Sequence, residues 1–256
     1  MQAMLEVDEH HWWYRGRRAI IAGELERLQL PPRARVLDAG CGSGRTLLEL
    51  APYGQVADIE LSEDAAAVAR SRGDFDVRLG RLEQLPFESG TFDLITCLDV
   101  IEHTPDDVGA LRELRRVSAP GARLLLTVPA YQALWSRHDV ANHHFRRYSR
   151  RSLRTAAQHA GWQIDRMTSF NSLLLAPAAA VRLLQRNRSA TGEYATDLQL
   201  GSRGLNRLLE LPMRVEARWL AADRTLPAGL SLLAVASNPV AATPHAQPVG
   251  AASAGH

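Results

Sequence analysis

Lysine is absent from the sequence, so each of its 30 Lys and Arg residues is an arginine. The 28 acidic residues nearly balance them, and the formal net charge is only +2. A charge this small does not predict a nucleic-acid partner, because such partners require a concentrated basic surface. We interpret the arginine-only composition as a coding bias toward G and C, and we expect no nucleic acid to bind.

Cysteines and long apolar runs are also scarce. The two cysteines, Cys41 and Cys97, are too few for a disulfide framework and indicate a reducing compartment. No run reaches the roughly 18 apolar residues of a membrane-spanning helix, and no basic-then-apolar leader opens the chain. We therefore expect a cytoplasmic protein. Its 46% hydrophobic and 23% charged residues suit one globular α/β domain with additions.

The most informative segment runs from Val36 to Gly44 and reads VLDAGCGSG. A short apolar run ends in Asp38, and a glycine-rich turn leads directly into a helical pattern over residues 45–50. Glycines at positions 40, 42 and 44 permit positive φ angles and a close approach of the backbone to a bound molecule. A strand, a tight glycine turn and a helix N-terminus together predict a nucleotide-cofactor pocket.

The spacing of this turn narrows the choice of cofactor. The glycines follow a G-x-G-x-G pattern rather than the G-x-G-x-x-G pattern that binds a pyrophosphate, and Asp38 stands two residues before the first of them. The Asp38 carboxylate would repel a phosphate and attract an ammonium group. The pattern therefore favours S-adenosylmethionine, whose methionine end carries an amine and a sulfonium.

At these residues the chain resembles the class I S-adenosylmethionine-dependent methyltransferases, in particular the small-molecule enzymes of the quinone-biosynthesis group. The first motif of that family reads much as Val36 to Gly44 does, and further motifs follow in order to about residue 170. The resemblance implies an α/β fold with a Rossmann-like, seven-stranded, mostly parallel sheet and helices on both faces. It also implies S-adenosyl-L-methionine as the cofactor and S-adenosyl-L-homocysteine as the product.

The pattern of apolar residues agrees with such a sheet. Strands are expected at 35–38, 56–60, 77–79, 92–98, 122–128, 162–169 and 230–236. Helices are expected at 9–28, at 44–51, from 62 onward, at 106–117 and at 152–160. The alternation of strand and helix predicts parallel strands covered by helices on both faces.

On this basis we divide the chain into five parts. Residues 1–30 form an N-terminal aromatic helix or lid, and residues 31–170 form the cofactor-binding core. Residues 171–228 are expected to be a helical insertion that serves as a lid or an acceptor pocket, followed by the last core strand at 229–238. Ala, Pro, Gly and Ser dominate residues 239–256, which predicts a disordered tail.

Residues at the strand ends are candidates for holding the cofactor, because the ligand crevice of an open α/β sheet lies there. The family pattern implies that Glu60, at the end of the second strand, accepts both ribose hydroxyls. Leu61 and Leu82 would pack on the faces of the adenine ring. At the position after Gly80 the family usually has an acid that contacts the adenine amine. This chain has Arg81 there, so it departs from the family pattern at this contact. The full set of cofactor candidates is Tyr14, Arg18, Asp38, Gly40, Cys41, Gly42, Glu60, Leu61, Arg81, Leu82 and Asp99.

Aromatic and basic residues crowd the N-terminal segment 10–18. Aromatic side chains this dense are costly to expose, so the segment either packs over the sheet or folds onto the bound cofactor. By analogy with the N-terminal helices of related methyltransferases, Tyr14 and either Arg15 or Arg18 would meet the methionine carboxylate. The alternative is an anchoring helix whose tryptophans belong to the core.

The segment from Asp99 to His103 reads DVIEH and resembles the motif that follows the fourth strand in this family. Asp99 or the Leu98 carbonyl would hold the methionine end of the cofactor. His103 is a candidate general base for an oxygen or nitrogen nucleophile, since an imidazole titrates near neutrality. The alternative is that Glu102 and His103 only cap the next helix or support the cofactor loop.

A second polar and aromatic cluster lies in the loop 129–150 after the fifth strand. Loops at this place commonly shape the acceptor pocket in the resembling family, so His138 and Asp139 are predicted to bind substrate. His144 and Tyr148 are added to the candidate catalytic residues. No metal is expected, because the spacing matches no tetrahedral template and no cysteine joins the histidines. The alternative is a hydrogen-bonded loop with a stacked arginine.

The expected reaction is a direct displacement, in which the protein aligns a nucleophile with the sulfonium methyl group and removes a proton. We predict a small, hydrophobic or lipid-linked acceptor, with oxygen and nitrogen nucleophiles ahead of carbon. The apolar helix near 173–184 and the arginine-rich helix at 205–220 could cover this acceptor or form a homodimer contact. They could also rest on an anionic membrane surface through Arg203, Arg207, Arg214 and Arg218.

Other classes of protein stay open on the sequence. A nicotinamide-dependent oxidoreductase is disfavoured by the glycine spacing and by Asp38. A non-catalytic module that binds S-adenosylmethionine for sensing or assembly is kept open by the departure at Arg81. A protein or nucleic-acid methyltransferase is disfavoured because no NPPY-like segment follows the fourth strand and no additional reader domain is evident.

Overall fold

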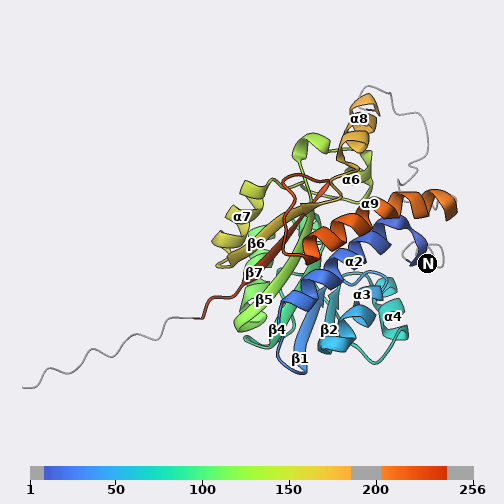
Figure 1. Ribbon diagram of the computed structural model, residues 1–256. Coiled ribbons are helices and arrows are strands. Elements are labelled where there is room, and N and C mark those ends of the chain that lie inside the picture. The colour runs from blue at the N-terminus through green and yellow to red at the C-terminus, as the bar shows by residue number, and fades with distance from the viewer. Residues whose placement is uncertain (1–8, 186–202, 241–256) are drawn as a thin grey trace, which may run out of the picture.

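A seven-stranded sheet forms the centre of the computed structural model, which describes residues 9–185 and 203–240 (Figure 1). The strand order is β3-β2-β1-β4-β5-β7-β6, and only β7 runs antiparallel to its neighbours. The Rossmann-like, mostly parallel sheet expected from the sequence is confirmed. The strands are β1 (Ala34–Ala39), β2 (Gly54–Glu60), β3 (Asp76–Leu79), β4 (Phe92–Leu98), β5 (Ser118–Pro129), β6 (Gln163–Phe170) and β7 (Ser231–Ser237).

The C-terminal strand lies inside the sheet rather than at its edge. β7 pairs with β5 on one side, from Arg123 opposite Ser237 to Pro129 opposite Ser231, and with β6 on the other. All of its residues except the last are buried. A nearly continuous apolar sequence suits this position, because both faces of an interior strand are covered. The earlier strand β6 therefore forms the edge.

Helices cover both faces of the sheet (Figure 1). The α-helices are α2 (Trp12–Arg27), α3 (Arg45–Leu50), α4 (Glu63–Ser71), α5 (Asp107–Val117), α6 (Arg137–Ala141), α7 (Arg150–His159), α8 (Leu175–Gln185) and α9 (Arg203–Ala221). Short 3-10 helices occur at η1 (Ala51–Tyr53), η2 (Ile101–His103) and η3 (Gln132–Leu134). Side-chain caps begin several of them: Ser62 accepts from the Ala65 N–H at the start of α4, and Asp106 accepts from the Gly109 N–H at the start of α5.

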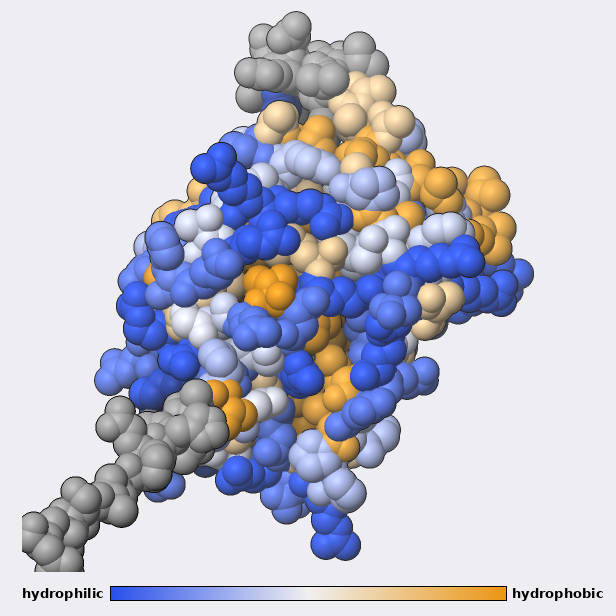
Figure 2. All heavy atoms as spheres, turned by 60° about the vertical axis from the view of Figure 1, so that its left-hand side comes forward, coloured by the Kyte–Doolittle hydropathy of each residue, from blue (hydrophilic) through white to orange (hydrophobic). Residues whose placement is uncertain are grey.

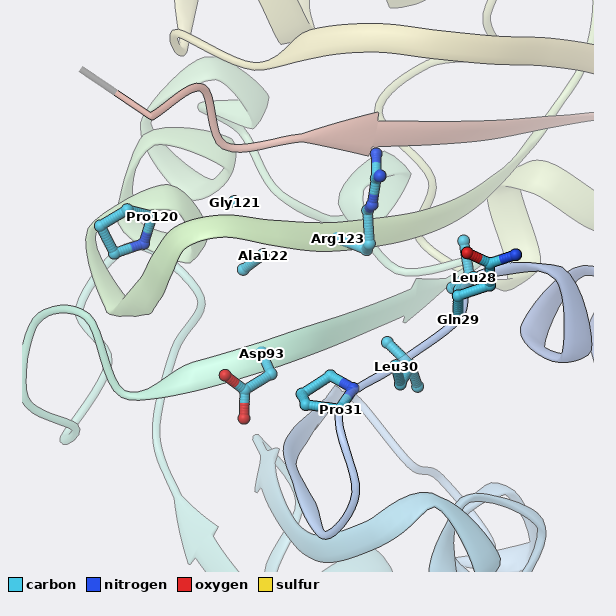
Figure 3. A pocket seen from close by; sticks show the side chains of 9 residues that line it. All are labelled: Leu28, Gln29, Leu30, Pro31, Asp93, Pro120, Gly121, Ala122 and Arg123. Carbon is cyan, nitrogen blue, oxygen red and sulfur yellow. The ribbon is translucent and has the colours of Figure 1, made fainter. Parts of the chain in front are cut away.

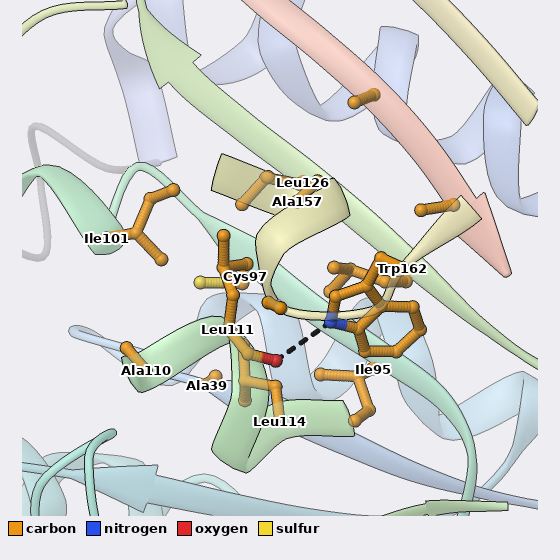
Figure 4. Close-up of a cluster of buried hydrophobic side chains, with 14 of the residues drawn as sticks. Ala39, Ile95, Cys97, Ile101, Ala110, Leu111, Leu114, Leu126, Ala157 and Trp162 are labelled. Carbon is orange, nitrogen blue, oxygen red and sulfur yellow. Dashed lines mark hydrogen bonds between the residues drawn. The ribbon is translucent and has the colours of Figure 1, made fainter. Parts of the chain in front are cut away.

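Alternate residues of each strand pack into one of two apolar layers. Val36 and Leu94 pack in one layer with α2 and α9, whereas Leu37 packs in the other with α5 and α7. In the second layer the buried indole of Trp162 donates a hydrogen bond to the Leu111 carbonyl at 2.8 Å (Figure 4). The bond satisfies the polar atom of a large side chain that would otherwise be costly to bury.

Helix α9 is part of the layer that covers the sheet. Met213 is fully buried, and a Cβ built at Gly16 of α2 would lie 2.4 Å from the Met213 Cβ. The two helices therefore approach too closely for any larger residue at position 16. The second half of the segment 171–228 thus packs on the core, and a role of this segment as a lid or an acceptor pocket stays a prediction.

The surface of the face shown in Figure 2 is mostly hydrophilic, with hydrophobic residues toward the upper right and in a further band near the middle of the view. Exposed apolar side chains are also present on α9, where Leu208, Leu211 and Val215 are all more than half exposed. None of the described helices combines the length and apolarity needed to cross a bilayer. Residues 241–256, which make up most of the expected disordered tail, lie outside the described residues.

Candidate functional site

The carboxyl ends of β1 and β4 meet where the strand order reverses, which is the place where ligands bind in open α/β sheets. Asp38 of β1 and Thr96 of β4 are paired there, and the Thr96 hydroxyl donates to Asp38 Oδ1 at 2.5 Å. The other carboxylate oxygen, Oδ2, is buried and has no hydrogen-bond partner among the described residues. Burial raises the pKa of Asp38 to about 7. A ligand that brings a positive charge would satisfy this oxygen.

Hydrogen bonds to Asp58 of β2 fix the glycine-rich turn that follows β1. Asp58 accepts hydrogen bonds from the Cys41 N–H at 3.1 Å and from the Cys41 thiol at 3.0 Å. Burial and the negative charge of Asp58 raise the pKa of this thiol, so Cys41 is structural rather than reactive. Gly42 has a φ of +54°, and a Cβ built there would meet no described atom within 4 Å. The turn therefore presents bare backbone to open space, as close approach of a cofactor requires.

Glu60 ends β2, and backbone amides already orient its carboxylate. Oε1 accepts from the N–H groups of Leu61 at 2.8 Å and Ser62 at 3.1 Å, and Oε2 accepts from the Gly42 N–H at 3.0 Å. These bonds fix the Glu60 side chain beside the glycine turn. A carboxylate offers about four acceptor positions, so one position on Oε2 stays open to a ribose hydroxyl.

The three adenine-side candidates differ in exposure. Leu61 is 68% exposed and follows Glu60 directly, so its side chain is available to cover a ring. Leu82 is buried in the hydrophobic core. The exposed Arg81 side chain points toward Glu83, with 3.7 Å between Nε and Oε2. The structure thus offers one apolar face at Leu61 and places Arg81 in a surface pair.

The N-terminal helix reaches the crevice through Arg17, which the sequence did not single out. Arg17 donates from Nη2 to the Leu98 carbonyl at 2.8 Å, and its Nε lies 3.0 Å from Asp99 Oδ2. Asp99 itself has a φ of +58°, a strained conformation for a residue with a side chain. Helical spacing could have identified Arg17, because it shares a face with the buried residues Ile20 and Glu24 at i, i+3 and i+7.

Tyr14 and Arg18, the predicted contacts of the methionine carboxylate, make other contacts in the structure. Arg18 Nε is 3.2 Å from Glu49 Oε1 on α3. The Tyr14 ring packs edge-on against Trp13, with 4.8 Å between centroids. Arg15, the other candidate, forms an ion pair with α9 at 3.2 Å. Arg17 contacts the end of β4 and is therefore a further candidate for the carboxylate, whereas Tyr14 and Arg18 stay predictions.

A second polar group lies beyond β4, in and around η2. Glu102 is 1% exposed, and neither carboxylate oxygen has a hydrogen-bond partner among the other described residues. Burial and the negative charge of Asp99 raise the pKa of Glu102 well above its usual range. The ring of His103 lies 4.6 Å from that of His144, at 86° to it. The structure therefore brings together two predicted catalytic histidines and a buried acid that the sequence left as a cap.

His103 is suited to accept a proton. Partial shielding of the ring from water, with a contribution from the neighbouring His144, lowers the pKa of His103, so its imidazole is neutral at neutral pH. The potential ligand atoms of Glu102, His103 and His144 all lie within 4.8 Å of one another, and these three side chains could together hold a metal ion. They form the one group of this kind in the described residues.

Asp139 was predicted to bind substrate, and the structure corrects this. Its carboxylate is fully buried and accepts from Arg147 Nε at 2.7 Å and from the Ser136 N–H at 2.8 Å, and its Oδ1 lies 2.9 Å from His144 Nδ1. Burial alone would raise the pKa of Asp139, yet these hydrogen bonds and the charge of Arg147 outweigh it and hold the pKa well below its usual range. Asp139 therefore anchors the loop and orients His144. His138, whose ring lies 6.3 Å from that of His144, stays a substrate-side prediction.

Tyr148 was predicted to assist catalysis, and the structure argues against it. The side chain is buried and its hydroxyl donates to Asp107 Oδ2 at 2.7 Å. Burial and the adjacent carboxylate raise the pKa of Tyr148, so the hydroxyl does not ionise near neutral pH. Tyr148 ties the loop to α5 instead.

A separate cavity of about 310 Å³ lies at the opposite end of the sheet, near the start of β4 and β5 (Figure 3). It contains none of the predicted site residues. Its lining consists of Leu28, Gln29, Leu30, Pro31, Asp93, Pro120, Gly121, Ala122 and Arg123. The cavity is therefore separate from the candidate site at the carboxyl ends of the strands.

Comparison with known proteins places the chain in a family. The profile of the methyltransferase domain family matches residues 12–166, which is 155 of the 256 residues. A ubiquinone biosynthesis O-methyltransferase from Xanthomonas oryzae pv. oryzae is 39% identical over 101 residues, covering 37% of this chain and 42% of that protein. The chain thus spans less than half the length of the curated relatives it matches.

Solved structures agree on the fold. A putative methyltransferase from Bacillus halodurans superposes with a TM-score of 0.60 at 20% identity, covering 86% of this chain and 99% of the other. Geranyl diphosphate methyltransferase in complex with SAM superposes with a TM-score of 0.59 at 18% identity, covering 87% and 85%. The chain belongs to the methyltransferase domain family and has the Rossmann-like fold that the resemblance of Val36 to Gly44 implied.

Proposed function

We propose that the protein transfers a methyl group from S-adenosylmethionine to an oxygen or nitrogen atom of a small, hydrophobic or lipid-linked metabolite. The observation that carries the proposal is Asp38, a buried carboxylate with one unpartnered oxygen beside the bare backbone of Gly42. A pyrophosphate would be repelled at this place, whereas the ammonium group of a methionine moiety would supply the missing hydrogen bond.

The surrounding residues fit the rest of this cofactor. Arg17 would hold the methionine carboxylate, Glu60 the ribose hydroxyls, and Leu61 one face of the adenine. When bound, the cofactor supplies an electrophilic methyl group on a sulfonium. The protein then has to place the acceptor atom in line with that methyl group, and orientation of this kind accounts for much of the rate of such reactions.

We propose that the methyl acceptor binds beside Glu102, His103 and His144. His103 is neutral near neutral pH and lies at the exposed end of η2, so it would take the proton of the acceptor. The relative from X. oryzae is named an O-methyltransferase of ubiquinone biosynthesis. That name supports an oxygen nucleophile on a hydrophobic acceptor.

Incubation with methyl-labelled S-adenosylmethionine and a lysate of the source cells tests the proposal, with mass identification of the labelled product. We expect a labelled small molecule with the wild type and none with Asp38→Ala. Calorimetric titration with S-adenosylhomocysteine and with NADH separates the alternatives. Binding of the dinucleotide would instead establish an oxidoreductase, and cofactor binding without any labelled product would favour a non-catalytic module.

A further inference from the structure

Helix α9 directs its acidic side chains inward and several of its apolar side chains outward. Glu210 and Glu216 are buried, whereas Leu208, Leu211 and Val215 are each more than half exposed. Helices of globular proteins normally place such residues the other way round, because burial of apolar surface is favourable and burial of a charge is costly. A contiguous row of exposed apolar side chains is typical of a binding surface.

Contacts within the protein fix the inward acids. Glu210 Oε2 lies 3.2 Å from Arg15 Nε on α2, and its Oε1 lies 2.7 Å from Arg214 Nε. Glu216 Oε1 accepts hydrogen bonds from the N–H groups of the two residues 172 and 173, at 2.8 and 3.0 Å. These contacts set the rotation of α9 about its axis, so the outward position of its apolar row follows from the packing.

The exposed side chains form an ordered surface along α9. Positions 208, 211, 215 and 219 follow helical spacing and share one face of the helix. The exposed arginines at 207 and 218 lie along one side of this row by the same spacing. We call this surface the α9 face, and it consists of Leu208, Leu211, Val215, Trp219, Arg207 and Arg218.

The charge of the α9 face distinguishes among partners. Both acids of α9 are buried, so arginines are the charged residues that accompany the apolar row on this helix. A second copy of α9 has no exposed acid to offer them, and two such faces in contact would repel each other. The surface of an anionic bilayer supplies an apolar layer for the leucines and negative head groups for the arginines.

From this arrangement we propose that the α9 face binds to the surface of a membrane that contains anionic lipids. The helix would lie in the plane of the interface, with its leucines among the acyl chains and its arginines extended to the head groups. Trp219 suits this depth, since indole rings gather at the boundary between head groups and acyl chains. The inference goes beyond the proposed function, and the contact does not depend on methyl transfer.

Contact at α9 would bring the crevice close to the bilayer. Helices α2 and α9 lie side by side, where Gly16 meets Met213 (Figure 1). The residue after Gly16 is Arg17, which donates to the Leu98 carbonyl at the end of β4. Helix α2 therefore connects the α9 face to the crevice. If the proposed function holds, a hydrophobic acceptor that resides in the bilayer would lie near the site of transfer.

Vesicle flotation with the full chain, carrying no affinity tag, tests the contact. Vesicles of phosphatidylcholine alone are compared with vesicles that also contain phosphatidylglycerol, which is anionic. We expect binding to the anionic vesicles to be tighter by at least about tenfold, because each arginine near the surface contributes to the attraction. The difference should shrink as the salt concentration rises, because salt screens the charges.

A pair of matched double variants tests the arginines. Arg207→Gln combined with Arg218→Gln should weaken binding to the anionic vesicles by at least about tenfold. The control combines Arg112→Gln with Arg154→Gln, which removes two exposed arginines from α5 and α7 on the other side of the sheet. Both variants lose the same net charge, and the control should bind within about twofold of the wild type.

A third double variant, Leu208→Gln combined with Leu211→Gln, removes apolar contact and should weaken binding by at least about tenfold. Far-ultraviolet circular dichroism confirms that each variant is folded. Analytical ultracentrifugation without lipid is run on the wild type and on this variant. A wild-type dimer that the variant dissociates would show that the α9 face binds a second copy instead, and would overturn the inference.

Two further results would overturn it: no binding of the wild type to anionic vesicles, or wild-type affinity in either double variant of the α9 face. Calorimetric titration with S-adenosylhomocysteine is run in parallel. Cofactor binding without vesicle binding defeats this inference alone, whereas vesicle binding without cofactor binding defeats the proposed function alone.

Discussion

The guanidinium of Arg17 lies 3.0 Å from the carboxylate of Asp99 and donates to the adjacent Leu98 carbonyl at 2.8 Å. These contacts join α2, near the start of the described chain, to the end of β4. They place a positive charge inside the crevice, where the charge of Arg17 also acts on Asp38. The N-terminal helix is thereby part of the candidate cofactor site and not only a cover for the sheet.

Arg17→Ala should weaken binding of S-adenosylhomocysteine about tenfold, which corresponds to about 1.4 kcal/mol, because a charge-assisted contact to the carboxylate would be lost. Isothermal titration calorimetry measures the dissociation constant. Arg18→Ala provides the matched comparison, since Arg18 pairs with Glu49 on α3. A larger loss in Arg18→Ala than in Arg17→Ala would return the assignment to Arg18.

Glu60→Ala should raise the same dissociation constant by at least about tenfold, since the ribose would lose a charge-assisted hydrogen bond. The glycine turn would also lose the hydrogen bond from Gly42 to Glu60. Glu63→Ala, which removes an exposed acid in the first turn of α4, is the control. An unchanged affinity in Glu60→Ala would remove this residue from the ribose site.

Asp38 should make the ligand-free protein less stable as the pH rises from about 4 to about 7. Its pKa is about 7 in the folded protein because the carboxyl is buried, against about 3.9 in an unfolded chain. Between these values the folded state holds a proton that the unfolded state has released, so the free energy of unfolding falls with rising pH. Asp58, with a pKa of about 8, adds a change of the same sign.

Urea unfolding of the wild type and of Asp38→Asn at several pH values measures this effect. The free energy of unfolding should fall less steeply with rising pH in Asp38→Asn than in the wild type. The two slopes should differ by up to about 1.4 kcal/mol per pH unit, the value for one proton. Parallel curves for the two proteins would show that Asp38 is already ionised in the folded state.

Tyr148→Phe should lower the free energy of unfolding by about 1 kcal/mol, because the variant loses the hydrogen bond to Asp107. Asp107 keeps its ion pair with Arg146 at 2.8 Å, so the loop should stay in place. Urea unfolding measures the stability, and the labelled-methyl assay measures activity. A large loss of methyl transfer with unchanged stability would restore a catalytic role for the tyrosine.

The core of the fold could be predicted from local signals. The segment VLDAGCGSG contains its own strand, turn and helix start, and the structure places them at Ala34–Ala39 and Arg45–Leu50. The strand expected at 92–98 is β4 with the same bounds. These elements depend on apolar periodicity and glycine conformation, which a sequence displays directly.

For the expected acceptor site, the sequence indicated candidate residues but not the contacts that their side chains make. From the sequence, the side chains of Asp139 and Tyr148 were expected to be free to meet a substrate. In the folded protein, Arg147 binds the carboxylate of Asp139, and Asp107 binds the hydroxyl of Tyr148. Glu102 looked like a helix cap, yet it is buried without a partner. Which polar atoms are bound and which are left open depends on contacts between segments that no local pattern records.

The sequence by itself determined the mostly parallel sheet and the glycine turn that Asp38 precedes, because each follows from the local chemistry of neighbouring residues. Tertiary structure alone decided that β7 lies inside the sheet, that α9 packs against Gly16, that Arg17 reaches the end of β4, and that Glu102 meets His144. The physical reason is that burial and hydrogen bonding between distant segments set the energy of each polar group, and both are properties of the packed chain.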